Sequence, residues 1–186
     1  MSLISERTLL VDTGPLCRLA EAGEVHLDVA VTYLREVLTV VMDVHRELRR
    51  RSEQPVHARL KRLEQLGVPR DEPITITDAS LLSRIDAIVE GRRRHKPGHE
   101  NEDRGEVATA LVAASRQVPA LIDDGFGKRL AESERVEVFT TEDLAVELAA
   151  VGALKPIHAW GMYRIVYADA KRAEFEARVA ALKAKL

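Results

Sequence analysis

The sequence predicts an α/β fold with three layers (α/β/α), in which helices cover both faces of a central parallel sheet of about five strands. Short apolar runs alternate with longer helical stretches along the chain, and this alternation is typical of βαβ units with right-handed crossovers. Several of the apolar runs end directly before a carboxylate. An unpaired carboxylate is costly inside a core, whereas the carboxyl ends of parallel strands open onto one edge where ligands bind. Both observations favour a parallel sheet with polar groups along one edge.

The first expected elements lie in the N-terminal part of the chain. Residues 8–12 predict a short buried strand, and a first helical turn or two is expected over residues 16–22. Residues 26–37 predict a helix, and residues 38–42 are apolar and mostly β-branched, which predicts the second strand. Further strands are expected at residues 74–77, 119–123 and 136–139, and further helices at residues 43–53, 55–66, 79–93, 103–116 and 125–133.

The C-terminal part of the chain has a helical pattern from Thr141 onward, with interruptions near Gly152 and Pro156. We expect one domain over residues 1–155. A C-terminal helical tail over residues 156–186 is expected to follow it, either packed on the domain or placed at a dimer interface.

Composition excludes several classes of protein. The chain has 186 residues, of which 46% are hydrophobic and 31% charged, and these values fit one globular domain and exclude a disordered chain. Its apolar runs are far shorter than the ~18 residues of a membrane-spanning helix, and its N-terminus lacks the pattern of a secretory signal. Cys17 is the single cysteine, which excludes an internal disulfide and a cysteine-built zinc site. We therefore expect a cytoplasmic protein without a membrane partner.

Two basic clusters occur in a chain whose net charge is only −2. The cluster Arg49–Arg51 is best explained by the preference of cations for the last turn of a helix. For the second cluster, a solvated helix end and a phosphate-binding role are equally well supported. Its candidate nucleic-acid-binding residues are Arg92, Arg93, Arg94 and Lys96.

Two acidic residues follow the first two expected strands. Asp12 ends the first apolar run and is either a helix cap or a metal ligand; its place at the end of a strand favours the ligand. Glu47 lies one turn into the helix after the second strand and leans back toward the sheet edge. From the local sequence alone, an ion pair with Arg50 or Arg51 on the helix surface is the better explanation of Glu47.

Two further acidic pairs occur later in the chain. Asp103 and Glu106 are three residues apart, so both can face one side of a helix, although a capping-box start explains them as well. Gly105 is a poor helix former beside Glu106, at a place where a close backbone approach would require it. Asp123 and Asp124 are adjacent at a strand end, and both cannot cap the following helix. We expect Asp123 to be a ligand and Asp124 to be a cap or a second ligand.

The arrangement of strand, carboxylate and helix repeats in order along the chain, which makes the joint signal stronger than any single residue. Hard oxygen ligands suit Mg²⁺ or Mn²⁺, and such a site can activate a water molecule and stabilise charge on a phosphodiester. The predicted metal ligands are Asp12, Glu47, Asp103, Glu106, Asp123 and Asp124.

Four segments of the chain resemble the PIN-domain family, and the resemblance covers most of residues 8–150. These segments are Val11–Leu16, the strand and helix that lead to Glu47, Arg104–Leu111 and Leu121–Ala131. The resemblance implies a small parallel-sheet nuclease that cleaves single-stranded RNA with Mg²⁺ or Mn²⁺. It also implies a homodimer and a toxin paired with an antitoxin protein, as in many members of the family. By position, it implies that Asp12, Glu47, Glu106 and Asp123 are catalytic and that Asp103 and Asp124 are auxiliary.

The chain departs from the family pattern in three places. The connection over residues 84–102 is long and rich in Arg and His, a helical tail follows the last motif, and no Ser or Thr directly precedes Asp123. The leading hypothesis is a metal-dependent endoribonuclease, and the alternative is a non-catalytic PIN-like module that binds RNA or a protein. A phosphatase or phosphoacceptor that uses Asp12 as its nucleophile is disfavoured, because no second aspartate follows two residues later.

Overall fold

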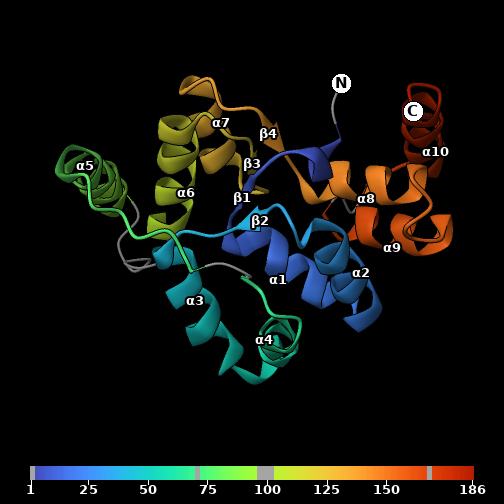
Figure 1. The fold of residues 1–186 in the computed structure, drawn as a ribbon, viewed down its shortest axis with the longest axis horizontal. Helices are drawn as coiled ribbons and strands as arrows, with labels where there is room; N and C mark the ends of the chain where they lie inside the picture. The colour runs from blue at the N-terminus through green and yellow to red at the C-terminus, as the bar shows by residue number, and fades with distance from the viewer. Residues whose placement is uncertain (1–2, 70–71, 96–102, 167–168) are drawn as a thin grey trace.

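A parallel sheet lies at the centre of the molecule (Figure 1). The computed structural model describes residues 3–69, 72–95, 103–166 and 169–186, and within these ranges the sheet has four strands in the order β2-β1-β3-β4. Leu10 of β1 lies opposite Thr39 of β2 on one side and Ala120 of β3 on the other. The strands are β1 (Leu9–Val11), β2 (Leu38–Thr39), β3 (Ala120–Leu121) and β4 (Val138–Phe139).

The strand expected over residues 74–77 is reduced to a single bridge. Ile74 pairs in parallel with Val41, and its N–H donates to the Val40 carbonyl at 2.9 Å. Pro73, which has no N–H, precedes this point, and Thr75 and Thr77 are exposed. The segment therefore follows the β2 edge for one residue only, and the described sheet has four strands rather than the expected five.

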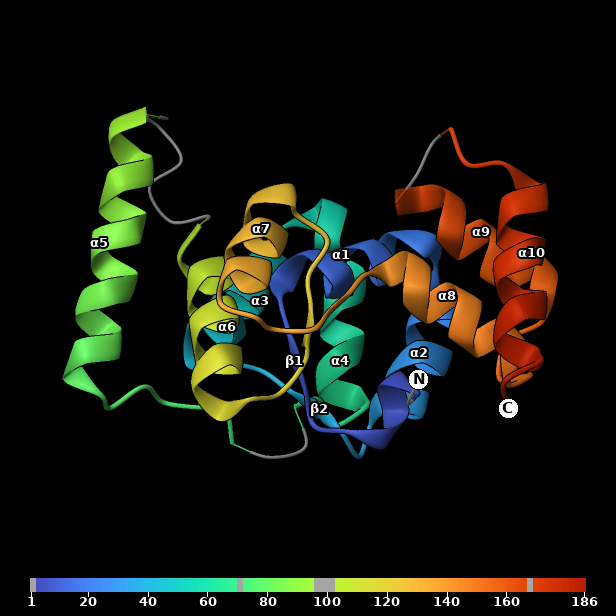
Figure 2. The ribbon, with the colours of Figure 1, turned by 90° about the horizontal axis from the view of Figure 1, so that it is seen from above.

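Helices on both faces of the sheet make the fold an α/β architecture consistent with three layers. Figures 1 and 2 show α6 and α7 on one side of the sheet, with α1, α2 and α8 on the other. The helices are α1 (Thr13–Ala22), α2 (Glu24–Leu34), α3 (Met42–Ser52), α4 (Lys61–Gln65), α5 (Ala79–His95), α6 (Asp103–Arg116), α7 (Gly125–Ser133), α8 (Thr141–Ala150), α9 (Pro156–Val166) and α10 (Arg172–Lys183), with 3₁₀ turns at Ile4–Glu6 and Pro55–Leu60. None of the described helices is long and apolar enough to cross a membrane.

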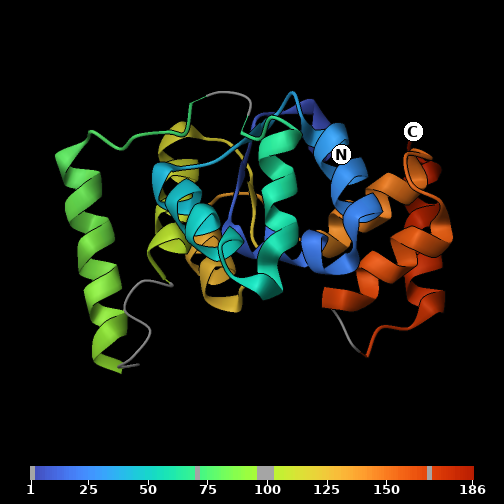
Figure 3. The same cartoon turned by 90° about the horizontal axis from the view of Figure 1, so that it is seen from below.

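The packing of α6 explains how side chains reach the sheet edge. Its residues Val107, Ala108, Ala110 and Leu111 are almost fully buried, and small side chains allow a helix to lie close to a sheet. The helix contacts β1 and β3 on one side and α3 on another, as Figure 3 shows for α3. Residues of α3 and α6 therefore meet at the same edge.

The two ends of the molecule are formed by α5 and by α9 with α10 (Figure 2). Both C-terminal helices pack against α8. An aromatic cluster joins α9 to α10: the ring of Tyr163 lies 5.9 Å from that of Trp160 and 5.2 Å from that of Phe175. Tyr163 and Phe175 are almost fully buried, so hydrophobic burial holds these helices together.

Candidate metal centre at the carboxyl edge of the sheet

The strand order places a crevice at the carboxyl ends of β1 and β3. The chain moves from β1 to one side, to β2, and then returns to the other side, to β3. Ligands bind at such a reversal in open α/β sheets. Asp12 follows β1 and Asp123 lies just beyond β3, and the Asp12 N–H donates to the Leu121 carbonyl at 3.1 Å. The two aspartates therefore stand on neighbouring strands.

Asp12 is both a helix cap and a perturbed acid. Its carboxylate accepts a hydrogen bond from the Gly14 N–H at 3.4 Å, which caps α1. The side chain is buried, with 6% exposed. Burial, and then the nearby charges of Glu47 and Asp123, raise the pKa of Asp12 to about 7, although the hydrogen bonds from backbone N–H groups lower it. The hydrogen bonds of the cap therefore lower the pKa of Asp12 by less than burial and the nearby carboxylates raise it.

Asp123 is held by groups from the next strand and helix. The Thr141 N–H and hydroxyl donate to its two oxygens at 2.8 and 2.7 Å, and the Arg18 Nε lies 3.4 Å away. The carboxylate is almost fully buried, with 1% of the side chain exposed. Thr141 thus supplies a hydroxyl beside Asp123, although no Ser or Thr precedes Asp123 in the chain. The sequence contains no local signal for this contact.

Glu47 reaches the same edge from α3. Its side chain is 7% exposed and accepts from Arg51 Nε at 2.8 Å, so the ion pair suggested by the local sequence is present. A Cβ at Gly105 would lie 3.0 Å from Glu47 Oε2 and 3.2 Å from Val44 Cγ2. Gly105 therefore lets α6 approach α3 closely at Glu47 and Val44.

Glu106 and Asp124 form a carboxyl–carboxylate pair. Asp124 caps α7 by accepting from the Phe126 N–H at 2.7 Å, and Glu106 accepts from the Gly127 N–H. Burial, followed by the hydrogen bond to Asp124, raises the pKa of Glu106 to about 9. The same bond lowers the pKa of Asp124. The two groups therefore titrate as a coupled pair, in which Glu106 holds a proton more tightly than Asp124.

The glycine at position 127 is required by this pair. A Cβ there would lie 2.9 Å from Glu106 Cδ, a distance that real Cβ contacts do not show. Only glycine lets the start of α7 approach the Glu106 side chain and donate its N–H to it. The motif Gly125-Phe126-Gly127 therefore serves to seat Glu106.

The four buried carboxylates form one electrostatic group, here called the acidic cluster. The charges of Glu47 and Asp123 act on Asp12, and the charge of Asp12 acts on Glu106. Each of these carboxylates nevertheless has at least one hydrogen-bond partner in the protein. Among the described residues, no three His, Cys, Asp or Glu side chains lie close enough together to hold one metal ion, and the side chain of Asp103 falls outside the described part. The acidic cluster consists of Asp12, Glu47, Glu106 and Asp123.

The donor set of the acidic cluster matches a hard divalent cation in chemistry. All of its groups are carboxylates, the preferred ligands of Mg²⁺ and Mn²⁺. Two hydroxyls beside the cluster in sequence, Thr13 Oγ1 and Thr109 Oγ1, are buried and have no hydrogen-bond partner within the described part of the chain. Such orphaned groups are costly. The fit to a metal thus rests on ligand type, and the present side-chain positions are not those of a closed ligand shell.

Two cavities lined by arginine adjoin the carboxylates, one at Glu47 and one at Asp124. Arg46 and Arg50 come from α3 and Arg104 from α6, where Arg104 also pairs with Asp43 at 3.1 Å. A second cavity of about 580 Å³ lies between α5 and α7 and includes Arg92 and Arg129. The first cavity, of about 240 Å³, is lined by Asp43, Arg46, Glu47, Arg50, Arg104 and Gly105.

The predicted basic cluster is divided by the structure. Arg92 lies at the α5–α7 cavity, with its guanidinium carbon 3.6 Å from the centre of the Phe126 ring. Arg93 and Arg94 are exposed and pair with Glu90 at 3.9 and 3.6 Å, and neither lines the cavity; Lys96 falls outside the described residues. No sequence pattern predicted that the cavities are lined by Arg46, Arg50, Arg104 and Arg129. The spacing of Arg46 and Arg50, four residues apart on the helix of Glu47, is the one signal that could have revealed the first cavity.

No protein-family model, no curated protein and no solved structure matches this chain. The acidic cluster and its cavities are therefore interpreted from their own chemistry.

Proposed function

We propose that the protein is a metal-dependent endoribonuclease that cleaves phosphodiester bonds of single-stranded RNA. One observation carries the proposal: four buried carboxylates from β1, α3, α6 and the end of β3 are gathered at the reversal point of a parallel sheet. Like charges gathered in a buried place repel each other unless a cation or protons compensate them. In this proposal Mg²⁺ or Mn²⁺ is that cation, held by Asp12, Glu47, Glu106 and Asp123, with Asp103 and Asp124 as auxiliary residues.

The chain's own residues have distinct tasks in this proposal. When bound, the metal supplies an activated water and stabilises charge on the phosphodiester. Asp12 and Glu106 would give up protons to become ligands, because a pKa of about 7 leaves Asp12 partly protonated at neutral pH and a pKa of about 9 leaves Glu106 largely protonated. Arg51 and Arg18 orient Glu47 and Asp123 by direct ion pairs. This division makes metal affinity dependent on pH.

Cations beside the acidic cluster support a phosphodiester substrate. Arg46, Arg50 and Arg104 line the cavity next to Glu47, and guanidinium groups bind phosphate oxygens in a bidentate manner. A polyanion would meet these cations beside Glu47, and Arg92 and Arg129 in the cavity that Asp124 lines. The choice of single-stranded RNA, rather than another phosphodiester, rests on the resemblance of the four segments to PIN domains.

The same resemblance leads us to propose the biological setting. We infer a toxin of a toxin–antitoxin pair that acts in the cytoplasm as a homodimer and is held inactive by an antitoxin protein. The C-terminal extension over residues 156–186 would then contribute to the dimer or to the antitoxin interface. Co-purification of the protein with the product of its neighbouring gene tests this setting.

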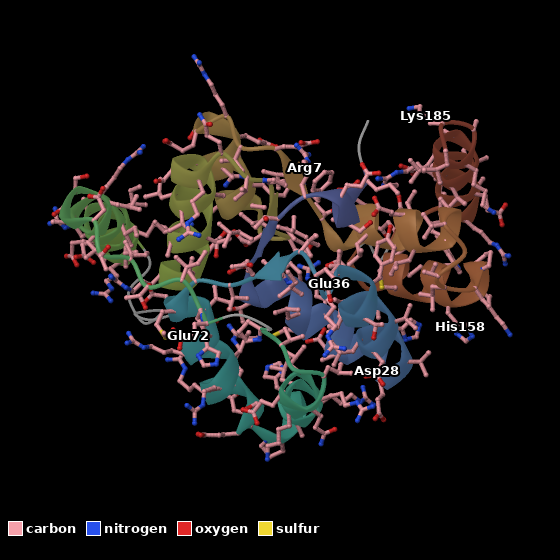
Figure 4. All side chains as sticks on the ribbon, in the orientation of Figure 1. Arg7, Asp28, Glu36, Glu72, His158 and Lys185 are labelled. Atoms are coloured by element: carbon pink, nitrogen blue, oxygen red, sulfur yellow. The ribbon has the colours of Figure 1, made fainter. Side chains whose placement is uncertain are left out.

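The experiment that tests the activity is cleavage of a mixed single-stranded RNA pool by the purified protein with Mn²⁺. We expect cleavage that EDTA abolishes and that Asp12→Asn and Asp123→Asn each reduce by about 100-fold or more, as is typical for loss of a group that acts at the reacting centre. Asp28→Asn is the matched control. Asp28 lies on α2, at the margin of the molecule (Figure 4). It forms an ion pair with Arg62 of α4 at 3.0 Å. Cleavage that persists in Asp12→Asn or in EDTA would contradict the proposal.

A second candidate function is a non-catalytic module that binds RNA or a protein. Its supporting observation is that every carboxylate of the acidic cluster already has a protein partner, and no three of them converge in the described residues. This candidate predicts RNA binding that neither EDTA nor Asp12→Asn changes, with no turnover. The RNA pool experiment therefore separates the two candidates.

A further inference from the structure

The cavity between α5 and α7 is lined by both apolar and cationic side chains. From α5 come Ile88, Gly91 and Arg92, and from the start of α7 come Gly125, Phe126 and Arg129. Its volume of about 580 Å³ falls within the range of small-ligand sites. Asp124 completes the lining and joins the cavity to the acidic cluster through its hydrogen bond with Glu106.

Gly91 leaves space in this cavity, although no neighbouring atom requires a glycine at this position. It lies in the interior of α5, where glycine costs about 1 kcal/mol relative to alanine. A Cβ at this position would meet no atom within 4 Å, and its φ is not in the left-handed region. Neither a close contact nor the backbone thus requires glycine here. The space in front of Gly91 is the feature that a larger residue would remove.

Arg92 and Phe126 together form a flat cationic surface. The guanidinium of Arg92 lies over the Phe126 ring at 3.6 Å, so that its planar group is held in place by the aromatic face. RNA bases stack on aromatic rings and on guanidinium planes. A base is the ligand whose size and flatness match this surface, because its π-face tolerates both apolar Ile88 and the cation.

Arg129 supplies a separate cation for a phosphate. It lies one turn into α7, and a Cβ at Gly125 would be 3.3 Å from its Nη1, so Gly125 allows the guanidinium to lie across the start of the helix. A flat ring surface with a cation beside it is complementary to a nucleotide: the base stacks and the phosphate pairs. Neither an uncharged ring compound nor a bare phosphate would use both surfaces.

We propose that the α5–α7 cavity is a nucleotide subsite, in which one base stacks on Arg92 and the adjoining phosphate binds Arg129. The subsite holds the RNA nucleotide next to the bond that the acidic cluster cleaves. This last statement rests on the proposed function, whereas the binding of a nucleotide does not. Asp124 lines the cavity and is hydrogen-bonded to Glu106, so the RNA would pass from the cavity onto the carboxylates.

The test measures binding rather than cleavage, with a labelled single-stranded RNA oligonucleotide and the wild-type full chain in EDTA. Arg92→Ala and Arg94→Ala form a matched pair, because both remove one positive charge from α5 but only Arg92 lines the cavity. We expect Arg92→Ala to weaken binding by about tenfold, the size expected for loss of one stacked base. Arg94→Ala is expected to weaken it by less than about threefold. Equal losses in the two variants would overturn the subsite.

A second pair of variants tests the open space while leaving the fold intact. Gly91→Leu fills the cavity and favours helix at the same position, so it should weaken RNA binding while the melting temperature stays or rises. Ser83→Leu adds the same bulk at an exposed position of α5 that does not line the cavity, and should bind as wild type. Unchanged binding in Gly91→Leu would overturn the proposal.

Competition identifies the ligand and separates the two proposals. Adenosine monophosphate should displace the oligonucleotide and should lose affinity in Phe126→Ala, whereas inorganic phosphate should compete far more weakly. Phosphate that competes equally well would overturn a base-stacking role. If these binding results hold but no RNA is cleaved with Mn²⁺, the proposed nuclease function fails and the nucleotide subsite stands.

Discussion

The molecule contains two kinds of buried carboxylate, and their difference separates structure from chemistry. Glu147 of α8 is 4% exposed and accepts from the Ile4 N–H at 2.8 Å and from the Tyr33 hydroxyl at 2.8 Å, with the Ser5 N–H at 3.4 Å. All of its donors are neutral, and they tie the N-terminal turn to α2 and α8. A buried carboxylate that accepts several hydrogen bonds in this way has a structural role: it stabilises the packing of the segments that donate to it.

The acidic cluster at the sheet edge is arranged in the opposite way. Asp12 and Glu106 lie near other carboxylates, and this proximity adds to burial in raising their pKa values to about 7 and about 9. Both regions therefore contain buried carboxylates, but Glu147 is held by neutral donors, whereas in the acidic cluster nearby carboxylates raise the pKa of Asp12 and Glu106. Groups perturbed by crowding are found mainly where function requires them.

The largest expected difference between the two regions is in RNA cleavage. Glu106→Gln should lower the Mn²⁺-dependent cleavage rate by about 100-fold or more. An amide is a poor ligand for a hard cation and, unlike a carboxyl group, cannot lose a proton to become an anionic ligand. Glu147→Gln should leave the rate per folded molecule within about twofold of wild type. Both variants replace one buried Glu by its isostere, so the comparison is matched in size and burial. Equal rates for the two variants would remove the distinction drawn between the regions.

Stability should respond in the reverse order. Glu147→Ala leaves two backbone N–H groups and the Tyr33 hydroxyl without their acceptor, and should cost about 3 kcal/mol of unfolding free energy. For a chain of this size, that corresponds to a melting temperature lower by roughly 6–12 °C. Glu132→Ala, at an exposed position of α7, is the control and should change the melting temperature little. An unchanged melting temperature in Glu147→Ala would show that the hydrogen bonds of Glu147 do not stabilise the fold.

Local signals account for what the sequence could predict of these regions. The alternation of strands and helices, the caps at Asp12 and Asp124 and the position of carboxylates at strand ends all depend on neighbours along the chain. The edge of a parallel sheet then brings Asp12 and Asp123 together whatever the details of the connections. For this reason the α/β class and the position of Asp12 and Asp123 at the ends of neighbouring strands could be predicted from the sequence.

Distant contacts account for what the sequence could not predict. Thr141 lies 18 residues from Asp123, and Ile4 lies 143 residues from Glu147; no local pattern marks either pair. The bridge at Ile74 is short because Pro73 and a polar, exposed continuation limit it, which alternation of apolar residues does not reveal. The stacking of Arg92 on Phe126, which divides the basic cluster, likewise depends on how α5 packs beside α7.

Without metal, neutralising the acidic cluster should stabilise the fold at high pH. The folded-state pKa of Glu106 is about 9, above its ordinary value of 4.5. Its neutral form is therefore favoured by folding, so the stability it contributes is complete below about pH 4.5 and is lost as the pH rises toward about 9. Glu106→Gln mimics the protonated acid, since its amide can still donate to Asp124 and accept from the Gly127 N–H.

We expect Glu106→Gln to be more stable than wild type by about 2 kcal/mol near pH 9 and equal to it near pH 4. The measurement is urea unfolding in EDTA across this pH range. Glu147→Gln provides the contrast, because Glu147 faces neutral donors and its replacement should lower stability at every pH. A Glu106→Gln variant that is less stable than wild type at pH 9 would mean that Glu106 is paired with a cation, and not crowded by acids.

The smallest expected effect is the pH dependence of metal affinity. Because Asp12 must lose a proton to become a ligand and its pKa is about 7, its contribution should raise the affinity for Mn²⁺ by about tenfold for each pH unit below that value and level off above it. Glu106, whose pKa is about 9, should add a further rise that continues to about pH 9. Titration calorimetry in two buffers of different ionisation enthalpy should show protons released on binding at about pH 6.5. Asp12→Asn should abolish this part of the release, whereas Glu147→Gln should retain it. Binding that releases no proton and does not vary with pH would mean that the metal, if it binds, is held elsewhere than at the crowded carboxylates.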